Sequence, residues 1–302
     1  MRKFRLDSEL SEKQIEADVA TFFGWISPEG QMPFQLIDTN EQIYGADKIF
    51  DYVIPIYIQF KVARGLSPIP RFDMTPSPLK RIQRFRQQNN LFHNPTLYFK
   101  LNNLAKNAAE YQHNILYELA HTPNVYAFYV APLTLDKNEY NQLLFDKDHR
   151  YYTHPFYYEL EHKIRASQSV TMIRGMPFLR AHISIFPHER VRSSNHYYSF
   201  SPNGTEIAWH SPQNLANRIN RLSDVLSGIL NISFAYKNRW FFIDEYARVT
   251  DSLRRGLVIN ENNNNAENSM DRITEFGREL YVKYDIRQIL LVTTNESLSR
   301  QQ

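Results

Sequence analysis

The sequence predicts a mixed α/β protein in which helices flank a β-sheet. Ser11 and Gln14 form the pattern of a helix capping box, and apolar residues at helical spacing then predict a helix over 11–23. Residues 56–62 alternate between apolar and polar side chains, which is typical of a β-strand. The continuous apolar run over 125–132 predicts a strand buried on both faces, and the strand and long helix predicted before it indicate a crossover unit.

The composition agrees with a globular chain that buries a large core. The chain has 302 residues, of which 42% are hydrophobic, and its formal net charge is +3. So small a net charge means that an anionic partner must be met by a local basic patch. The absence of cysteine excludes disulfides, zinc-thiolate sites and thiol nucleophiles.

Aromatic residues are unusually frequent, with 19 Tyr and 20 Phe against nine Gly. Such side chains supply either a densely packed core or stacking surfaces for bases, and the composition favours the core. The first residues lack the apolar segment of a signal peptide, and no window approaches the length of an apolar membrane span. We therefore expect a soluble, cytoplasmic protein with no membrane partner.

The remaining elements follow from local patterns. Prolines and a glycine predict an irregular segment over 26–34, and five prolines exclude a helix or central strand over 67–78. The other elements that we predict are strands over 34–37, 95–101, 181–186, 196–200 and 286–293, two strands within 45–62, helices over 79–88, 104–121, 211–230 and 270–283, a turn at 202–204 and an exposed loop over 259–270.

The helix over 79–88 is strongly basic. Apolar side chains at helical spacing alternate with four cations, namely Lys80, Arg81, Arg84 and Arg86. This pattern is typical both of an ordinary solvated helix face and of a helix that contacts nucleic-acid phosphates. We take these four residues as candidates for nucleic-acid binding.

Three short segments near the first helix carry the candidate chemistry. They are Gly45-Ala46-Asp47, Gln59-Phe60-Lys61 at the end of the alternating strand, and Glu16 on the preceding helix. This arrangement resembles the PD-(D/E)XK nuclease superfamily, in which an aspartate on one strand is followed by an acidic-X-lysine motif on the next strand. Some branches of that superfamily have glutamine at the acidic position. The resemblance covers roughly residues 9–132.

The resemblance implies a restriction-endonuclease-like fold, a mixed β-sheet flanked by helices. It places a nuclease core in residues 1–160, followed by a C-terminal α+β extension over 161–302 that can pack on the core as one unit. It also implies metal-dependent hydrolysis of phosphodiester bonds in nucleic acid, with DNA favoured over RNA, and it allows a homodimer.

The chemistry gives each residue of the motif a role around Mg²⁺ or Mn²⁺, which prefer oxygen ligands. Asp47 would supply a carboxylate, Gln59 its side-chain carbonyl and Phe60 its main-chain carbonyl, while Glu16 would reach the ion through water. Lys61 would orient the nucleophile and offset charge on the phosphate. Because Gln59 is neutral, metal binding is weakened unless Glu16 or Asp51 compensates.

Other sites have less support. Gln112 on the helix over 104–121 is a secondary candidate for the active site, because a polar residue on this helix often faces the site in the superfamily. The histidines at 182, 188, 196 and 210 lack the spacing of a metal site. The chain also lacks a nucleophile elbow, a phosphate-binding loop and a dinucleotide-binding glycine motif.

Two further functions remain open. A non-catalytic nucleic-acid-binding protein would carry the same fold with a degraded metal site at Gln59. A protein-interaction role would use the tyrosine-rich region over 150–200, with the motif arising by coincidence.

Overall fold

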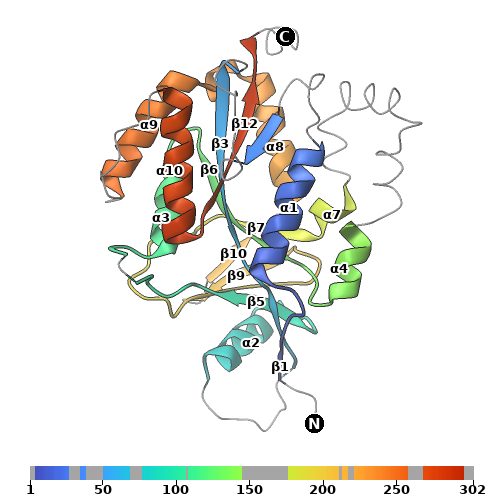
Figure 1. Cartoon of the computed structure of the whole chain (residues 1–302). Helices are drawn as coiled ribbons and strands as arrows, with labels where there is room; N and C mark the ends of the chain where they lie inside the picture. Colours follow the sequence, from blue (N-terminus) through green and yellow to red (C-terminus); the bar gives the residue numbers. More distant parts are fainter. Residues whose placement is uncertain are drawn as a thin grey trace, which may run out of the picture.

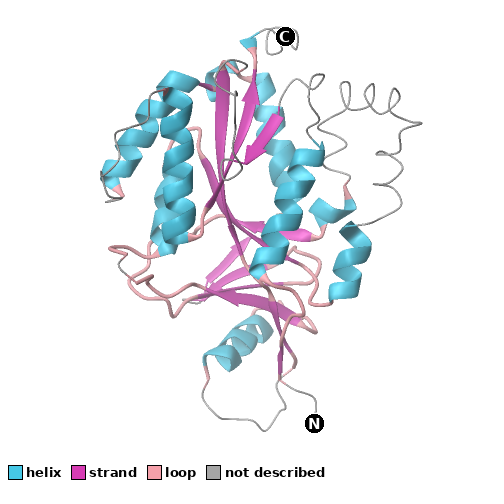
Figure 2. Cartoon of the chain, viewed as in Figure 1, coloured by secondary structure: helices cyan, strands magenta, loops and turns pink. Residues whose placement is uncertain are grey.

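A computed structural model gives the structure of the chain (Figure 1). It describes residues 4–26, 35–38, 50–68, 77–106, 108–144, 176–210, 213–216, 221–257 and 268–295. These residues form a mixed α/β structure, as the sequence predicts, and their strands form two β-sheets (Figure 2).

The first sheet, which we call the central sheet, has the strand order β2-β12-β3-β6-β7. The two-residue strand β11 pairs with the first two residues of β3. Only β3 and β6 run parallel. Its strands are β2 (Gln35–Asp38), β3 (Tyr52–Phe60), β6 (Tyr126–Pro132), β7 (His182–Ile185), β11 (Phe241–Phe242) and β12 (Arg287–Thr293).

Helices cover both faces of the central sheet (Figure 1). On one face, α1 (Glu12–Ile26) and α8 (Leu222–Ala235) pack against the even-numbered residues of β3. On the other face, α3 (Gln112–His121), α9 (Ile243–Gly256) and α10 (Ser269–Tyr284) cover Val53 and Tyr57. Every residue of β3 is therefore buried, because β3 is a central strand and its polar alternate positions do not face solvent.

The predicted crossover is present, but it joins different strands. The parallel partner of β6 is β3, with Ile56 opposite Tyr126, and α3 precedes β6 on the path between them. The strand predicted over 95–101 belongs to the second sheet instead. The path from β3 to β6 thus includes two further strands and a helix, namely β4 (Arg64–Leu66), α2 (Pro78–Gln88) and β5 (Thr96–Lys100).

The second sheet, which we call the lower sheet, is antiparallel in the order β1-β4-β5-β8-β9-β10. It lies below the central sheet in Figure 1, and α2 (Pro78–Gln88) covers its outer face. Its strands are β1 (Arg5–Leu6), β4 (Arg64–Leu66), β5 (Thr96–Lys100), β8 (Tyr197–Phe200), β9 (Ile207–His210) and β10 (Gln213–Ala216).

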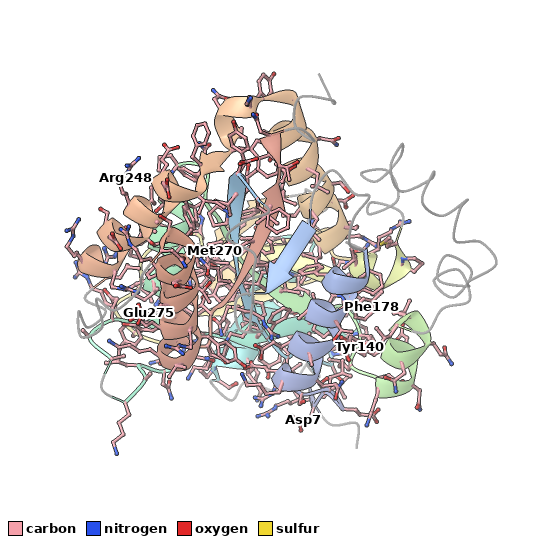
Figure 3. The ribbon with its side chains drawn as sticks, turned by 45° about the horizontal axis from the view of Figure 1, so that its top comes forward. Asp7, Tyr140, Phe178, Arg248, Met270 and Glu275 are labelled. Carbon is pink, nitrogen blue, oxygen red and sulfur yellow. The ribbon has the colours of Figure 1, made fainter. Side chains whose placement is uncertain are left out.

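Aromatic side chains fill the space between the two sheets. Phe99 of β5 lies 5.3 Å from Tyr129 of β6, measured between ring centres, and 5.4 Å from Tyr198 of β8. Elsewhere, Tyr140 of α4 (Lys137–Leu144) and Phe178 of α7 (Pro177–Arg180) lie side by side (Figure 3). The described part of the chain thus uses much of its aromatic content in its core.

Several predicted elements agree with the structure. Ser11 caps α1 through a hydrogen bond from the Gln14 amide, and Ser77 caps α2 in the same way. The turn at 202–204 includes Gly204 at a φ of 71°, a conformation that glycine adopts without strain. The strands predicted over 286–293 and 125–132 are β12 and β6.

Other elements differ from the prediction. The helix predicted over 104–121 begins at Gln112, and Leu104, which supported the longer helix, is 46% exposed and packs in no core. The helix predicted over 211–230 is replaced by β10, which pairs with β9, and by α8 from Leu222. α9 is an additional helix that was not predicted, although its buried residues are spaced as on one helix face.

The chain on either side of residue 160 contributes to both sheets. β12 lies between β2 and β3 in the central sheet, and β8 pairs with β5 in the lower sheet. The expected domain boundary itself lies in 145–175, outside the described residues. In the described part of the chain, no helix is long and apolar enough to cross a membrane.

Candidate functional site

Lys61 lies directly after the last residue of β3. Its amide donates to the Val130 carbonyl, which extends the pairing of β3 with β6 by one residue. Its side chain is only 1% exposed. The ammonium donates to Asn102 Oδ1 at 2.6 Å and lies 3.9 Å from a carboxylate oxygen of Glu12, at the start of α1. A buried cation is thus held at the end of the central sheet.

The environment of Lys61 perturbs its acid–base behaviour. Burial lowers the pKa of Lys61 to about 8, although the nearby carboxylates of Glu12 and Asp285 favour the charged form. An ammonium poised near neutral pH beside carboxylates is a frequent property of functional sites.

Asp285 reaches this site from the opposite end of the chain. It ends α10 in the left-handed conformation, with φ 55° and ψ 35°, and it directly precedes the segment that becomes β12. Arg287, the first residue of β12, is paired with Ile58 of β3, and Asp285 lies two residues before it. The chain that enters the strand beside β3 therefore carries a carboxylate whose charge acts on Lys61.

Lys13 connects Asp285 to Glu16. Its ammonium donates to Asp285 Oδ1 at 2.7 Å, to Glu16 Oε2 at 3.0 Å and to the Tyr281 hydroxyl at 3.1 Å. Burial alone would lower the pKa of Lys13, but these hydrogen bonds raise it above its ordinary value. Three oxygen atoms thus surround one cation at this point.

Glu16 is buried on α1. Its Oε1 atom lies 3.5 Å from Arg287 Nη1 and has no hydrogen-bond partner in the described part of the chain. We call the group Glu12, Lys13, Glu16, Lys61, Asp285 and Arg287 the charged cluster. It contains three carboxylates and three cations, so it is neutral when all six are ionised.

Gln59 does not join the charged cluster. By strand alternation its side chain shares the face of Tyr57, under α3 and α10, whereas Glu16 lies on the face covered by α1. Lys61 follows the last residue of β3 and is not bound by this alternation, and its ammonium reaches Glu12 of α1. Gln59 is fully buried, and neither atom of its amide has a hydrogen-bond partner among the described residues. The expected convergence of Gln59 and Glu16 on one ion is therefore not found.

The other residues of the expected metal site are dispersed. Asp47 lies outside the described residues. Asp51 precedes the first residue of β3, where it accepts a hydrogen bond from the Asn295 amide at 2.6 Å. Eight residues of extended chain, roughly 26 Å, separate it from Gln59. Asp51 therefore cannot compensate for Gln59. The Phe60 side chain packs in the α1-side core, which leaves only its main-chain carbonyl for a metal.

The charged cluster already places a cation, the Lys13 ammonium, between two of its carboxylates. Within the described ranges, no group of three or more His, Asp or Glu side chains is arranged to hold a metal ion. Glu16 and Asp285, however, both contact the Lys13 ammonium, and carboxylate oxygens are the ligands that Mg²⁺ and Mn²⁺ prefer. A divalent ion would therefore have to displace that ammonium.

Gln112 has a structural connection to Asp285. Its side chain is buried on α3, and its amide donates to the main-chain carbonyl of Tyr284, the residue before Asp285. It does not contact the charged groups directly. Gln112 thus holds the main chain at the end of α10, directly before Asp285.

The four basic residues of α2 separate into two classes. Arg86 is fully buried and donates to the carbonyls of Leu91 and Glu206 and to the hydroxyl of Ser199. Burial lowers the pKa of Arg86 to about 10. Its expected role in phosphate binding is therefore wrong, because its guanidinium is used to attach α2 to the lower sheet. Lys80, Arg81 and Arg84 remain at least partly exposed.

Sequence reasoning missed Lys13, Asn102 and Asp285. The signal for Asp285 was its place directly between the predicted helix over 270–283 and the predicted strand over 286–293. Nothing in the sequence pattern showed that this strand lies beside β3. Comparisons of the chain with protein-family models, with curated proteins and with solved structures found no match.

Proposed function

We propose that this chain is a metal-dependent hydrolase of phosphodiester bonds in nucleic acid, with DNA as the favoured substrate and the charged cluster as its site. The observation that carries the proposal is the buried Lys61 ammonium at the end of β3, influenced by the charge of Asp285, which ends α10 two residues before the neighbouring strand β12. The resembled superfamily has an aspartate and an X-lysine motif on successive strands, and here the neighbouring strand comes from the C-terminal end of the chain.

The fold supports this proposal in its general form. A mixed central sheet with helices on both faces agrees with a restriction-endonuclease-like core, in which β12 takes the place expected for a strand before β3. In this proposal Asp285 replaces Asp47 as the principal carboxylate. The proposal includes a cytoplasmic location. It also includes a homodimer if both strands of a duplex are cut.

The side chains of the cluster have distinct roles in the proposed reaction. Glu16 and Asp285 would hold the ion, and Mg²⁺ or Mn²⁺ would supply a polarised phosphate and a more acidic water. Because the Lys61 ammonium is buried, it would offset charge on the phosphate oxygens through its electric field and not by direct contact. Asn102 keeps the ammonium in place through its 2.6 Å hydrogen bond. Lys13 neutralises the two carboxylates, and an ion held by them would have to take its place.

The test is cleavage of supercoiled, linear and single-stranded DNA by the purified chain with Mg²⁺ or Mn²⁺. Asp285→Asn removes the charge and keeps a residue that tolerates the left-handed conformation, so it should abolish cleavage while the protein stays folded. Asp244→Asn, an exposed position on α9 near the other end of β3, is the matched control and should cleave normally. Equal activity in both variants would refute the assignment of the site.

A specific observation favours the second candidate, a non-catalytic nucleic-acid-binding protein. The Lys13 ammonium occupies the cation position, and Gln59 is turned to the other face of the sheet. In this case the wild-type chain binds nucleic acid in a salt-dependent manner and cleaves none. Lys13→Met separates the two functions. A hydrolase should gain Mn²⁺ affinity in this variant, measured by electron paramagnetic resonance, whereas a degraded site should bind no ion in either form.

A further inference from the structure

A groove lies between α2 and the outer face of the lower sheet. Its volume is about 490 Å³, within the range of small-ligand sites. The principal side chains that line it are Arg81, Arg84, Phe85, His196, Tyr197 and His210. We call it the α2 groove.

The attachment of α2 determines which side chains face the groove. Ile82, Gln83 and Arg86 are buried against the lower sheet, and Gln83 donates to the carbonyls of Leu66 and Ser67. Arg81, Arg84, Phe85 and Gln88 are three or four residues apart, so they form a single stripe beside the buried one. The helix thus presents two arginines and one aromatic ring along the same wall.

The described lining of the α2 groove is basic. Among the described residues it includes two arginines and no aspartate or glutamate. Arg81 is exposed, and no described carboxylate lies within ion-pairing distance of it. By contrast, Arg190 pairs with Glu110 and Glu118, both at 2.8 Å. Unlike that arginine, Arg81 is available to an anionic ligand.

Aromatic rings and imidazoles form the opposite wall. His196 stacks on the buried Trp209, with ring centres 5.0 Å apart and planes within 5° of parallel. Phe85 meets His210 edge to face at 5.4 Å. Flat rings at the surface of a basic groove are the usual means by which proteins stack unpaired bases.

His210 is neutral at physiological pH. Its Nε2 atom forms a hydrogen bond with the Ser199 hydroxyl at 2.8 Å, and Arg86 donates to the same hydroxyl. Burial, and then the charge of Arg86, lower the pKa of His210 to about 3. The groove therefore contains a neutral imidazole, which adds no charge to its wall.

We infer that the α2 groove binds unpaired nucleotides of a nucleic-acid strand, whose phosphates contact Arg81 and whose bases stack on the rings of Phe85 and Tyr197. An intact duplex does not expose its base faces, so the occupant is single-stranded. This inference rests on the proposed function, because it assigns the substrate strand a path on the protein.

β5 provides a route from the groove to the charged cluster. Lys100 is paired with Tyr197, a groove residue, and its exposed side chain lies on the same outer face of the lower sheet. Asn102, two residues later, bonds the Lys61 ammonium. A strand held in the α2 groove can therefore extend past Lys100 toward Lys61.

The test measures binding of a fluorescent strand of about 12 nucleotides to the full chain in EDTA, where no cleavage occurs. The DNA strand, the RNA strand of the same sequence and the DNA duplex are compared. We expect a single strand to bind about tenfold tighter than the duplex. Whichever of the DNA and RNA strands binds more tightly shows whether the groove prefers deoxyribose or ribose. A duplex that binds about tenfold tighter than either strand would overturn the inference.

Two substitutions locate the binding site. Arg81→Glu should weaken single-strand binding by about tenfold or more, whereas Arg248→Glu, an exposed arginine on α9 (Figure 3), should change it by less than about twofold. Phe85→Leu should weaken binding by about fivefold or more, and Phe85→Tyr should restore it because the ring is retained. Equal effects of Arg81→Glu and Arg248→Glu would count against the groove.

A photo-cross-link gives a result that does not depend on variants. A strand carrying 5-iodouracil should cross-link to peptides that contain Phe85 or Tyr197, and cross-links confined to other peptides would refute the path. If the chain cross-links at these peptides but cleaves no nucleic acid, the proposed hydrolysis is refuted and the binding site in the α2 groove stands. If cleavage requires Asp285 but single-strand binding is normal after Arg81→Glu, the binding site in the groove is refuted and the proposed hydrolysis stands.

Discussion

The side-chain amide of Gln112 donates a hydrogen bond to the main-chain carbonyl of Tyr284 and so joins α3 to the end of α10. Tyr284 directly precedes Asp285, whose amide bonds the Tyr281 carbonyl at 2.8 Å in the last turn of α10. The orientation of Asp285 is thus supported from two helices. This relationship explains why a buried amide stands at the first position of α3 without touching a charged group.

Replacing Gln112 should loosen this turn. Gln112→Leu preserves the side-chain size but leaves the Tyr284 carbonyl without its buried donor, which costs about 1–3 kcal/mol of stability. Hydrogen exchange of the amides of Asp285 and Ile286 should accelerate. Gln88→Leu, an exposed change on α2, should leave exchange there unaltered, and equal exchange in the two variants would argue against a positioning role.

Lys61 should make stability depend on pH in the alkaline range. Its pKa is about 8 in the folded protein and 10.5 in the unfolded chain, so between these values the unfolded chain binds one more proton. The free energy of unfolding therefore rises with pH above 8, by about 1.4 kcal/mol per unit from this group. Lys61→Met should remove that rise and be more stable at pH 7 by about 1–3 kcal/mol. Urea unfolding from about pH 7.5 to 9.5, below the main titration of tyrosine, measures both effects. The same slope in both proteins would contradict the burial of Lys61.

Arg86 and Arg81 should differ sharply although both are basic residues of α2. Arg86→Met leaves the Leu91 and Glu206 carbonyls and the Ser199 hydroxyl without their buried donor, so it should cost about 2–4 kcal/mol. Arg81→Met changes an exposed side chain and should stay within about 0.5 kcal/mol of wild type. Urea midpoints compare the two, and similar losses would show that Arg86 does not attach the helix.

His113 should contribute to acid destabilisation. Burial lowers its pKa to about 4, and its ring bonds the Tyr129 hydroxyl and the Glu189 carbonyl, both at 2.7 Å. Because the folded pKa is below the unfolded value of 6.5, this contribution is complete above pH 6.5 and is lost as the pH falls toward 4. His113→Gln should reduce the loss between pH 6.5 and 5 by about 2 kcal/mol, measured by unfolding at each pH. An unchanged acid slope would show that His113 is protonated in the folded state.

Local elements of the fold were predictable because their signals lie within a few residues. Ser11 and Ser77 cap α1 and α2 and so mark where these helices begin. The apolar run over 126–132 indicates a buried strand. Lys61 was a candidate because Gln59-Phe60-Lys61 resembles the acidic-X-lysine motif of the nuclease superfamily. α9 was also predictable, since its apolar spacing is regular.

The sequence by itself determined the mixed α/β class, the capped helices, the strands around 52–60 and 126–132, and Lys61 as the residue to follow. Only the tertiary structure decided that β12 pairs with β3, that the charge of Asp285 thereby acts on Lys61, that Gln59 faces the opposite helices and that Arg86 is buried. The physical reason is that helix and strand periodicity depends on neighbouring residues, whereas strand pairing joins segments that are more than 200 residues apart and that carry no local mark of their partner.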